Sequence, residues 1–136
     1  MGSAARLKLL LDTHIWLWSL GPKQKLSKKV ARQLADSRNE LWISPISCWE
    51  ILTLAKKGRL QLNRSPQAWV AAALRAGPFR EAAITNEIAL ALTEISLPHG
   101  DPADAFLAAT ARVYGLTLVT ADENLAAGSG FGLLRN

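Results

Sequence analysis

The feature that most constrains the fold is a short apolar run near the start of the chain that stops at a carboxylate. Residues 7–11 read Leu-Lys-Leu-Leu-Leu and are followed directly by Asp12, Thr13 and His14. An apolar run of this length, bounded by polar residues, is typical of a strand buried on both faces of a sheet. Asp12 is then expected at the carboxyl end of that strand, which is the edge where open α/β sheets bind ligands.

The rest of the chain alternates between helix-like and strand-like segments, without the short turns that join hairpins. Caps and breakers predict helices over about 27–37, 45–57, 65–76, 85–95 and 101–114, with a short turn or helix over 122–126. Apolar, β-rich stretches predict further strands over 40–44, 79–84, 116–120 and 132–134. This alternation predicts an α/β fold, a three-layer α/β/α sandwich around a central, mostly parallel sheet of four to five strands.

A chain of 136 residues is expected to form one domain with a sizeable core. We assign this domain to residues 6–136 and expect residues 1–5 to lie outside it, as a disordered start or a remnant of cloning. Cys48 is the only cysteine, so no internal disulfide can form and a reducing, cytoplasmic location fits. Asp12 to His14 interrupts the apolar start, which therefore resembles neither a secretion signal nor a membrane span.

Three further carboxylates are expected at the same edge as Asp12. In a parallel sheet, the carboxyl end of every strand and the amino end of the helix that follows it share one edge. Glu50 is expected in the first turn of the helix over 45–57, and Asp104 in the first turn of the helix that begins at Pro102. Asp122 directly follows the strand over 116–120. The four carboxylates therefore converge from distant parts of the chain.

Each of these carboxylates also has a purely structural interpretation. Ser47 and Glu50 have the spacing of a capping box, Asp101 is a good N-cap before a proline, and Asp12 and Asp122 fit turn caps. A cap contributes about 1 kcal/mol. Two carboxylates about 4 Å apart repel by roughly 4 kcal/mol at an effective dielectric constant of 20. A cluster of three or four must therefore take up protons or bind a cation.

An all-oxygen site of this kind suits Mg²⁺ or Mn²⁺. Zinc fits less well, because Cys48 is alone and the two histidines lack ligand-like spacing. The metal ligands predicted for phosphodiester hydrolysis are Asp12, Asp104 and Asp122, with Glu50 as a further ligand or as the group that orients the attacking water. Thr13 and Thr120 are candidates for hydrogen bonds to the carboxylates or waters, and an ordinary turn role is the alternative for each.

With these residues placed, the sequence resembles the PIN-domain ribonucleases, and most closely the VapC-type toxins of bacterial toxin–antitoxin pairs. Four stretches carry the resemblance in the family's order: Leu-Leu-Leu-Asp-Thr-His-Ile-Trp-Leu-Trp at 9–18, Ser-Cys-Trp-Glu-Ile at 47–51, Leu-Pro-His-Gly-Asp-Pro-Ala-Asp-Ala-Phe-Leu-Ala-Ala-Thr-Ala at 97–111 and Leu-Thr-Leu-Val-Thr-Ala-Asp at 116–122. Any one of them alone is a weak signal, whereas the four together are specific.

The resemblance implies an α/β/α sandwich that cleaves RNA endonucleolytically with Mg²⁺ or Mn²⁺. It also implies a homodimer and a cognate, VapB-like antitoxin that blocks the active-site groove. The family's acidic positions fall on Asp12, Glu50, Asp104 and Asp122, which leaves Asp101 as a cap or outer residue. The sequence departs from its relatives at three positions that bear on RNA binding and substrate choice. Gly100 and Ala105 stand where arginines are usual, and Ala103 stands where an aromatic residue is usual.

The net charge of +5 fits an RNA partner, and it fits a soluble protein with a basic surface equally well. Basic residues gather over 23–32 and over 56–64, and clusters of this kind are mostly solvated faces. If they hold phosphates, affinity falls steeply with salt. Lys56 and Arg59, downstream of Glu50, are the favoured candidates for RNA contact. Trp16 and Trp18 fit either the core or, with the helix over 46–57, an apolar antitoxin groove.

Three other functions compete with this interpretation. A phosphatase with Asp12 as nucleophile would want an aspartate two residues later, where His14 stands. A phospho-receiver domain would want a lysine late in the chain, and none follows Lys57. The non-enzymatic alternative is a catalytically weak module of the same fold that only binds RNA or an antitoxin. A missing carboxylate would mark such a module, and none of the four is missing.

Overall fold

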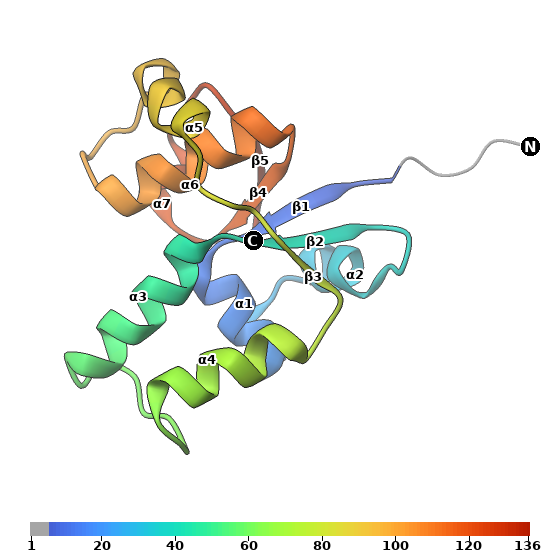
Figure 1. The fold of residues 1–136 in the computed structure, drawn as a ribbon. Coiled ribbons are helices and arrows are strands. Elements are labelled where there is room, and N and C mark those ends of the chain that lie inside the picture. The colour runs from blue at the N-terminus through green and yellow to red at the C-terminus, as the bar shows by residue number, and fades with distance from the viewer. Residues whose placement is uncertain (1–5) are drawn as a thin grey trace, which may run out of the picture.

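The computed structural model describes residues 6–136, in which five parallel strands form a single sheet (Figure 1). The expectation for residues 1–5 lies outside the described residues. The strands are β1 (Lys8–Leu11), β2 (Glu40–Ile43), β3 (Phe79–Glu81), β4 (Thr117–Thr120) and β5 (Gly132–Arg135). Their order across the sheet is β3-β2-β1-β4-β5, and every pairing between them is parallel. The predicted parallel α/β sheet is therefore confirmed, with β1 at its centre.

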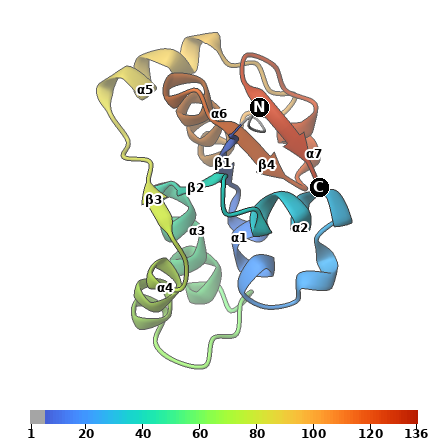
Figure 2. The same ribbon diagram turned by 90° about the vertical axis from the view of Figure 1, so that its right-hand side faces the viewer.

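Helices cover both faces of this sheet. They are α1 (Thr13–Leu20), α2 (Lys28–Ala35), α3 (Pro45–Lys56), α4 (Pro66–Arg75), α5 (Asn86–Ala91), α6 (Pro102–Tyr114) and α7 (Glu123–Ala126), with short 3₁₀ turns at η1 (Lys23–Lys25) and η2 (Leu92–Glu94). Figure 1 shows α1, α3 and α4 on one side of the sheet and α5 and α6 on the other. In Figure 2 the same two helical layers lie on either side of β1 and β2. The three-layer sandwich is confirmed.

The alternation of side chains along β1 explains why both faces are covered. Leu9 and Leu11 are fully buried in a core cluster that contains residues of α1, α2, α3 and α4. Leu10 points the other way, into a second cluster with residues of α6 and α7. Successive side chains of a strand face opposite sides of the sheet, so an unbroken apolar run needs a helical layer on each.

The predicted helix starts are largely confirmed by their caps. The side chains of Ser27, Ser65, Thr85 and Asp101 each accept a hydrogen bond from a backbone N–H in the first turn of the helix that follows. At its other end, α6 stops at Gly115, which has φ of +67°. Glycine adopts this left-handed conformation without the steric cost that a side chain adds.

The apolar stretch after His14, to which the sequence assigned no element, forms α1, whose N-cap is Asp12. One local prediction is wrong, and it concerns the cap of the helix next to the predicted site. The helix α3 begins at Pro45 with Ser44 as its cap, so Ser47 and Glu50 are not a capping box and Glu50 lies in the second turn. Proline at the first helical position favours this start, which agrees with the predicted range of 45–57, because it fixes φ and has no N–H to satisfy. None of the helices in residues 6–136 is long and apolar enough to cross a membrane.

Candidate active site

The predicted acidic residues lie at the carboxyl edge of the sheet, around the ends of β1 and β4. From β1 the chain proceeds outward through β2 and β3 on one side, and then returns to build β4 and β5 on the other. The gap between the carboxyl ends of β1 and β4 is therefore a topological switch point, where helices leave in opposite directions and open a crevice. Asp12 directly follows β1, and Asp122 follows β4 by two residues.

Asp12 is buried and is held by hydrogen bonds from both of these strands' ends. Its Oδ1 accepts from the backbone N–H of Thr13 at 2.7 Å, and its Oδ2 accepts from Oγ1 of Thr120 at 2.6 Å. Thr120 Oγ1 in turn accepts from the backbone N–H of Asp122 at 2.9 Å. The predicted supporting role of Thr120 toward a carboxylate thus corresponds to a direct contact. This chain of bonds fixes the Asp12 carboxylate across the β1–β4 gap.

Glu50 reaches the same crevice from α3. The Thr13 hydroxyl donates to Glu50 Oε1 at 2.7 Å and lies 3.1 Å from the hydroxyl oxygen of Ser47. A hydroxyl has one proton, and an ionised carboxylate can only accept, so the Thr13 proton belongs to the Glu50 bond. Thr13 therefore ties α3 to the start of α1. Ser47, which is fully buried, contributes a contact that the sequence analysis did not identify.

Asp104 and Asp122 approach from α6 and from the loop after β4. Asp104 lies in the first turn of α6, as predicted, and its Oδ2 accepts from Nδ2 of Asn124 at 2.9 Å. Asp122 caps α7, with Oδ2 accepting from the backbone N–H of Leu125 at 3.0 Å. Both Asp12 and Asp122 are thus helix caps as well as members of the acidic group, so the two interpretations do not exclude each other.

Asn124 is a site residue that sequence reasoning missed. Besides Asp104, its side chain binds the backbone of His99, accepting from the N–H at 2.7 Å and donating to the carbonyl at 3.0 Å. Asn124 therefore positions the loop before α6 together with the Asp104 carboxylate. The only signal in the sequence was its place two residues after Asp122, which is not distinctive by itself.

The pKa values show that these carboxylates share one electrostatic environment. Burial raises the pKa of Asp104 to about 7, the Asn124 hydrogen bond opposes this rise, and the charges of Asp122, Asp101 and Asp12 add to it. Burial is also the largest cause of the raised pKa of Asp12 and of Glu50. The negative charge of Asp12 contributes to the raised pKa of Glu50 as well. An added cation would relieve this repulsion.

The donor set fits Mg²⁺ or Mn²⁺, because it consists of carboxylate and hydroxyl oxygens around an acidic crevice. Within residues 6–136, no group of three or more His, Cys, Asp and Glu side chains is already arranged to hold a metal ion. Each carboxylate instead accepts hydrogen bonds from its own neighbourhood. Binding an ion would require side-chain movements that exchange some of these bonds for bonds to the ion.

A groove of about 670 Å³ extends from the acidic crevice between α3 and α6. Glu50 and Asp101 lie at the acidic part of its lining, and Lys57 and Arg59 provide positive charge. The remaining lining is mostly apolar, with Ile46, Trp49, Leu54, Pro102, Ala103 and Phe106. Of the two predicted RNA contacts, Arg59 lines this groove, whereas Lys56 is exposed and is not among its lining residues.

The small residues noted around the start of α6 are Gly100, Ala103 and Ala105. Gly100 is exposed, and a Cβ added to it would meet nothing within 4 Å. Ala103 lines the groove between α3 and α6 with its methyl group alone. Ala105 lines a shallow hollow that also includes His99 and Gly100. These small residues therefore leave open space around the start of α6.

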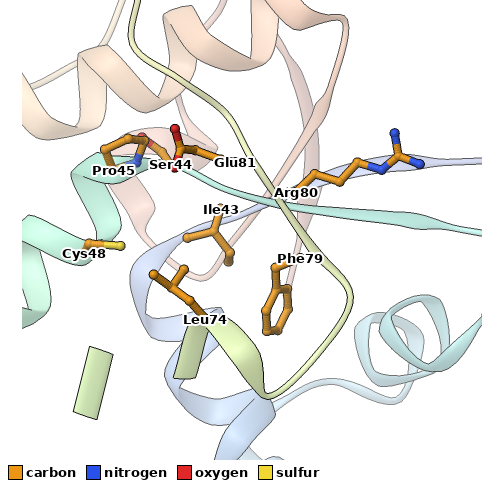
Figure 3. A pocket seen from close by; sticks show the side chains of 8 residues that line it. All are labelled: Ile43, Ser44, Pro45, Cys48, Leu74, Phe79, Arg80 and Glu81. Carbon is orange, nitrogen blue, oxygen red and sulfur yellow. The ribbon is translucent and has the colours of Figure 1, made fainter. Parts of the chain in front are cut away.

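A second hollow, of about 260 Å³, lies beside the edge strand β3 and holds none of the predicted site residues (Figure 3). In Figure 3 Ile43, Leu74 and Phe79 lie around it, with Cys48 on the α3 side, while Arg80 points away. Burial raises the pKa of the Cys48 thiol, and the charge of Glu81 raises it further. The thiol is therefore protonated at neutral pH and is a poor nucleophile.

The fold and the crevice define a parallel α/β protein with an acidic group at its switch point, and comparison with known proteins identifies the family. A model described as the PIN domain matches residues 9–129. "Ribonuclease VapC22" of Mycobacterium tuberculosis is 36% identical over 120 residues, covering 86% of this chain and 88% of that protein. The chain therefore belongs to the PIN domain family.

Crystal structures of other proteins have the same fold. VapBC2 from Rickettsia felis, bound to a DNA fragment from its promoter, matches with a TM-score of 0.69 at 17% identity, covering 95% of this chain and 98% of that chain. FitAcB from Neisseria gonorrhoeae matches with a TM-score of 0.62 at 19% identity, covering 93% of this chain and 96% of that chain. At such identities the likeness concerns the fold.

Proposed function

We propose that this chain is a divalent-metal-dependent endoribonuclease that acts as the toxin of a toxin–antitoxin pair. The observation that carries the proposal is the convergence of Asp12, Glu50, Asp104 and Asp122 on one crevice, where burial and mutual repulsion raise the pKa of Asp104 to about 7. Membership of the PIN domain family and similarity to a ribonuclease give the substrate class.

In this proposal Asp12, Asp104 and Asp122 hold the ion. When bound, Mg²⁺ or Mn²⁺ lowers the pKa of coordinated water and neutralises the negative charge that builds up on the phosphate. Thr120 and Thr13 keep the Asp12 carboxylate oriented toward the crevice. Glu50, held by the Thr13 hydroxyl, is placed to orient the attacking water and to accept its proton. Arg59 supplies positive charge for the RNA backbone along the groove.

The groove between α3 and α6 is the proposed binding site for a VapB-like antitoxin. It joins an apolar lining, including Trp49 at 55% exposure, to the acidic crevice, so a partner segment bound there would cover the carboxylates. The expected source of this partner is a short open reading frame that overlaps the gene. Its purified product should bind this chain and stop cleavage, and Trp49→Ala should weaken that binding.

A homodimer in the cytoplasm is also part of the proposal, and light scattering after gel filtration tests the dimer.

Cleavage of RNA by purified variants tests the central claim. Asp12→Asn and Asp104→Asn are each expected to abolish cleavage of single-stranded RNA in Mg²⁺ or Mn²⁺, while circular dichroism shows the fold unchanged. Asp36→Asn is the matched control, because Asp36 is an aspartate paired with Arg38 on the surface of the molecule. This variant should cleave RNA as the parent does.

Equal cleavage by the parent and both site variants in chelator would point to a contaminating nuclease and would refute the assignment. RNA binding by the parent without cleavage in either metal would favour the catalytically weak binding module instead. Labelling of Asp12 by acetyl phosphate would favour the phospho-receiver alternative. These three outcomes are distinct from one another, so a single set of purified proteins decides among the candidate functions.

A further inference from the structure

His14 stands out because its side chain is exposed within a buried stretch at the mouth of the acidic crevice. Asp12, Thr13, Ile15 and Trp16 are all buried, whereas His14 is exposed to solvent. It follows Thr13, whose hydroxyl binds Glu50, in the first turn of α1. Neither the proposed metal ligands nor the hydrogen bonds that orient them use its imidazole ring.

The His14 ring packs against an aromatic side chain one turn further along α1. Its centroid lies 5.9 Å from that of Trp18, with an angle of 48° between the ring planes. Trp18 also contacts a cation, because Lys25 Nζ lies 5.7 Å from the centroid of the Trp18 ring. Trp18 itself packs against the core cluster beneath α1. We call His14, Trp18 and Lys25 together the α1 platform.

Asn136 ties the segment that carries Lys25 to the carboxyl end of β4. Asn136 Nδ2 donates to the carbonyl of Lys25 at 3.0 Å, and its Oδ1 accepts from the backbone N–H of Ser27 at 2.7 Å. The backbone N–H of Asn136 donates to the carbonyl of Thr120 at 2.8 Å. Since the Thr120 side chain binds Asp12, the segment that carries Lys25 and the proposed catalytic carboxylate share one anchor.

The surface next to the α1 platform is basic. Lys23, Lys28, Lys29 and Arg32 are all exposed, and no ion pair involving them or Lys25 occurs within residues 6–136. Together they supply positive charge beside a strongly acidic crevice. A flexible polyanion whose backbone crosses that crevice would find favourable charge here, and aromatic rings beside such charge are the usual means of holding single-stranded nucleic acid.

We propose that the α1 platform is a base-stacking subsite, which binds a nucleobase of single-stranded RNA next to the phosphate held at the carboxylates. This inference rests on the proposed ribonuclease function and adds a subsite to it. The exposed His14 ring offers the stacking face, Trp18 holds that ring in place from below, and Lys25 contacts a neighbouring phosphate. Stacking tolerates any base, so the subsite contributes affinity and register rather than a strict sequence requirement.

Binding of RNA with and without bases tests the subsite. The protein carries Asp104→Asn so that RNA is not cut, and the probes are a fluorescein-labelled decaadenylate and the same oligonucleotide with abasic sugars at its central positions. Both probes have the same charge. The unaltered platform is expected to prefer the base-containing probe by about 5- to 150-fold, the range expected for one base stacked on an aromatic ring. His14→Ala should reduce this preference by about fivefold or more.

Three further variants separate stacking from charge. His14→Phe should restore the preference, because a phenyl ring stacks without a charge. Lys25→Met should weaken the binding of both probes equally and lower the salt dependence of binding. His99→Ala is the matched control, since His99 is the other histidine and no ring lies stacked on it within residues 6–136. It should keep the full preference for bases.

The platform proposal is overturned if His14→Ala weakens both probes equally, or if it leaves the preference for bases intact. The absence of any RNA binding would also overturn it, together with the proposed function. If the parent cleaves RNA but shows no His14-dependent preference for bases, only the platform proposal is refuted. If the protein shows a His14-dependent preference for bases but cleaves no RNA, the platform proposal stands and the proposed nuclease function is refuted.

Discussion

Replacing Asp104 with asparagine is expected to make the metal-free protein more stable at pH 8, although it removes a proposed metal ligand. The pKa of Asp104 is raised from 3.8 to about 7, chiefly by burial, so the folded protein resists ionisation of this group. At about 1.4 kcal/mol per tenfold change, this difference corresponds to about 4 kcal/mol. Asp104 is partly exposed, and solvent screening reduces the expected gain to roughly 1–2 kcal/mol.

The sign of this effect follows from proton linkage. Between pH 3.8 and about 7 the folded state keeps a proton on Asp104 that the unfolded state has lost. The free energy of unfolding of the parent therefore falls as pH rises through this window. Asparagine has no proton to lose at this position. The stability difference between Asp104→Asn and the parent should be small at pH 4 and should reach its full size at pH 8.

Urea denaturation in the presence of a chelator measures this difference at both pH values, and added Mg²⁺ should reverse it. An ion that binds only the folded parent adds about 2.7 kcal/mol at one hundred times its dissociation constant. The same concentration should stabilise Asp104→Asn much less. Asp36→Asn is again the control, because Arg38 lowers the pKa of Asp36 to about 2 and its neutralisation brings no gain. If Asp104→Asn is less stable than the parent at pH 8 in chelator, or if Mg²⁺ stabilises both equally, the reasoning is refuted.

Three further predictions concern the fold that supports the site. Gly115→Ala should lower the free energy of unfolding by about 1–2 kcal/mol, because φ at this position is +67° even though an added Cβ meets nothing within 4 Å. Gly100→Ala, also in open space, should leave this free energy unchanged, and urea denaturation compares the two variants. Leu118→Ala should lower the free energy of unfolding by about 2–5 kcal/mol, since this fully buried side chain fills the core beneath α6, and thermal unfolding checks the value. Asn136→Ala should accelerate hydrogen exchange at the Ser27 amide by about tenfold while β1 amides stay protected. Equal exchange at the Ser27 amide in the variant and the parent would show that the Asn136 hydrogen bond does not stabilise this segment.

The layers of the fold could be predicted from the sequence alone, which also predicted an acidic group at one edge of the sheet. The apolar run at 7–11 is too continuous for a half-exposed strand, so it required helices on both faces of the sheet. The caps at Ser27, Ser65 and Asp101 are local interactions, formed by residues at most three positions apart, and such signals can be read without knowing the rest of the chain. The parallel sheet then implied that its strand ends share an edge.

The hydrogen bonds that hold the site residues could not be predicted from the sequence. Thr13 lies 37 positions from the Glu50 carboxylate that its hydroxyl binds, and Thr120 lies 108 positions from Asp12. Such contacts depend on the order of the strands and on how each helix begins. The capping box predicted at Ser47 placed Glu50 in the first turn of its helix, whereas Ser44 is the cap and Glu50 lies in the second turn. The role of Asn124 and the packing of His14 on Trp18 were likewise invisible, because neither residue type nor spacing distinguishes them from ordinary surface positions. Long-range side-chain geometry is fixed by packing of the whole chain, and no local stretch contains that information.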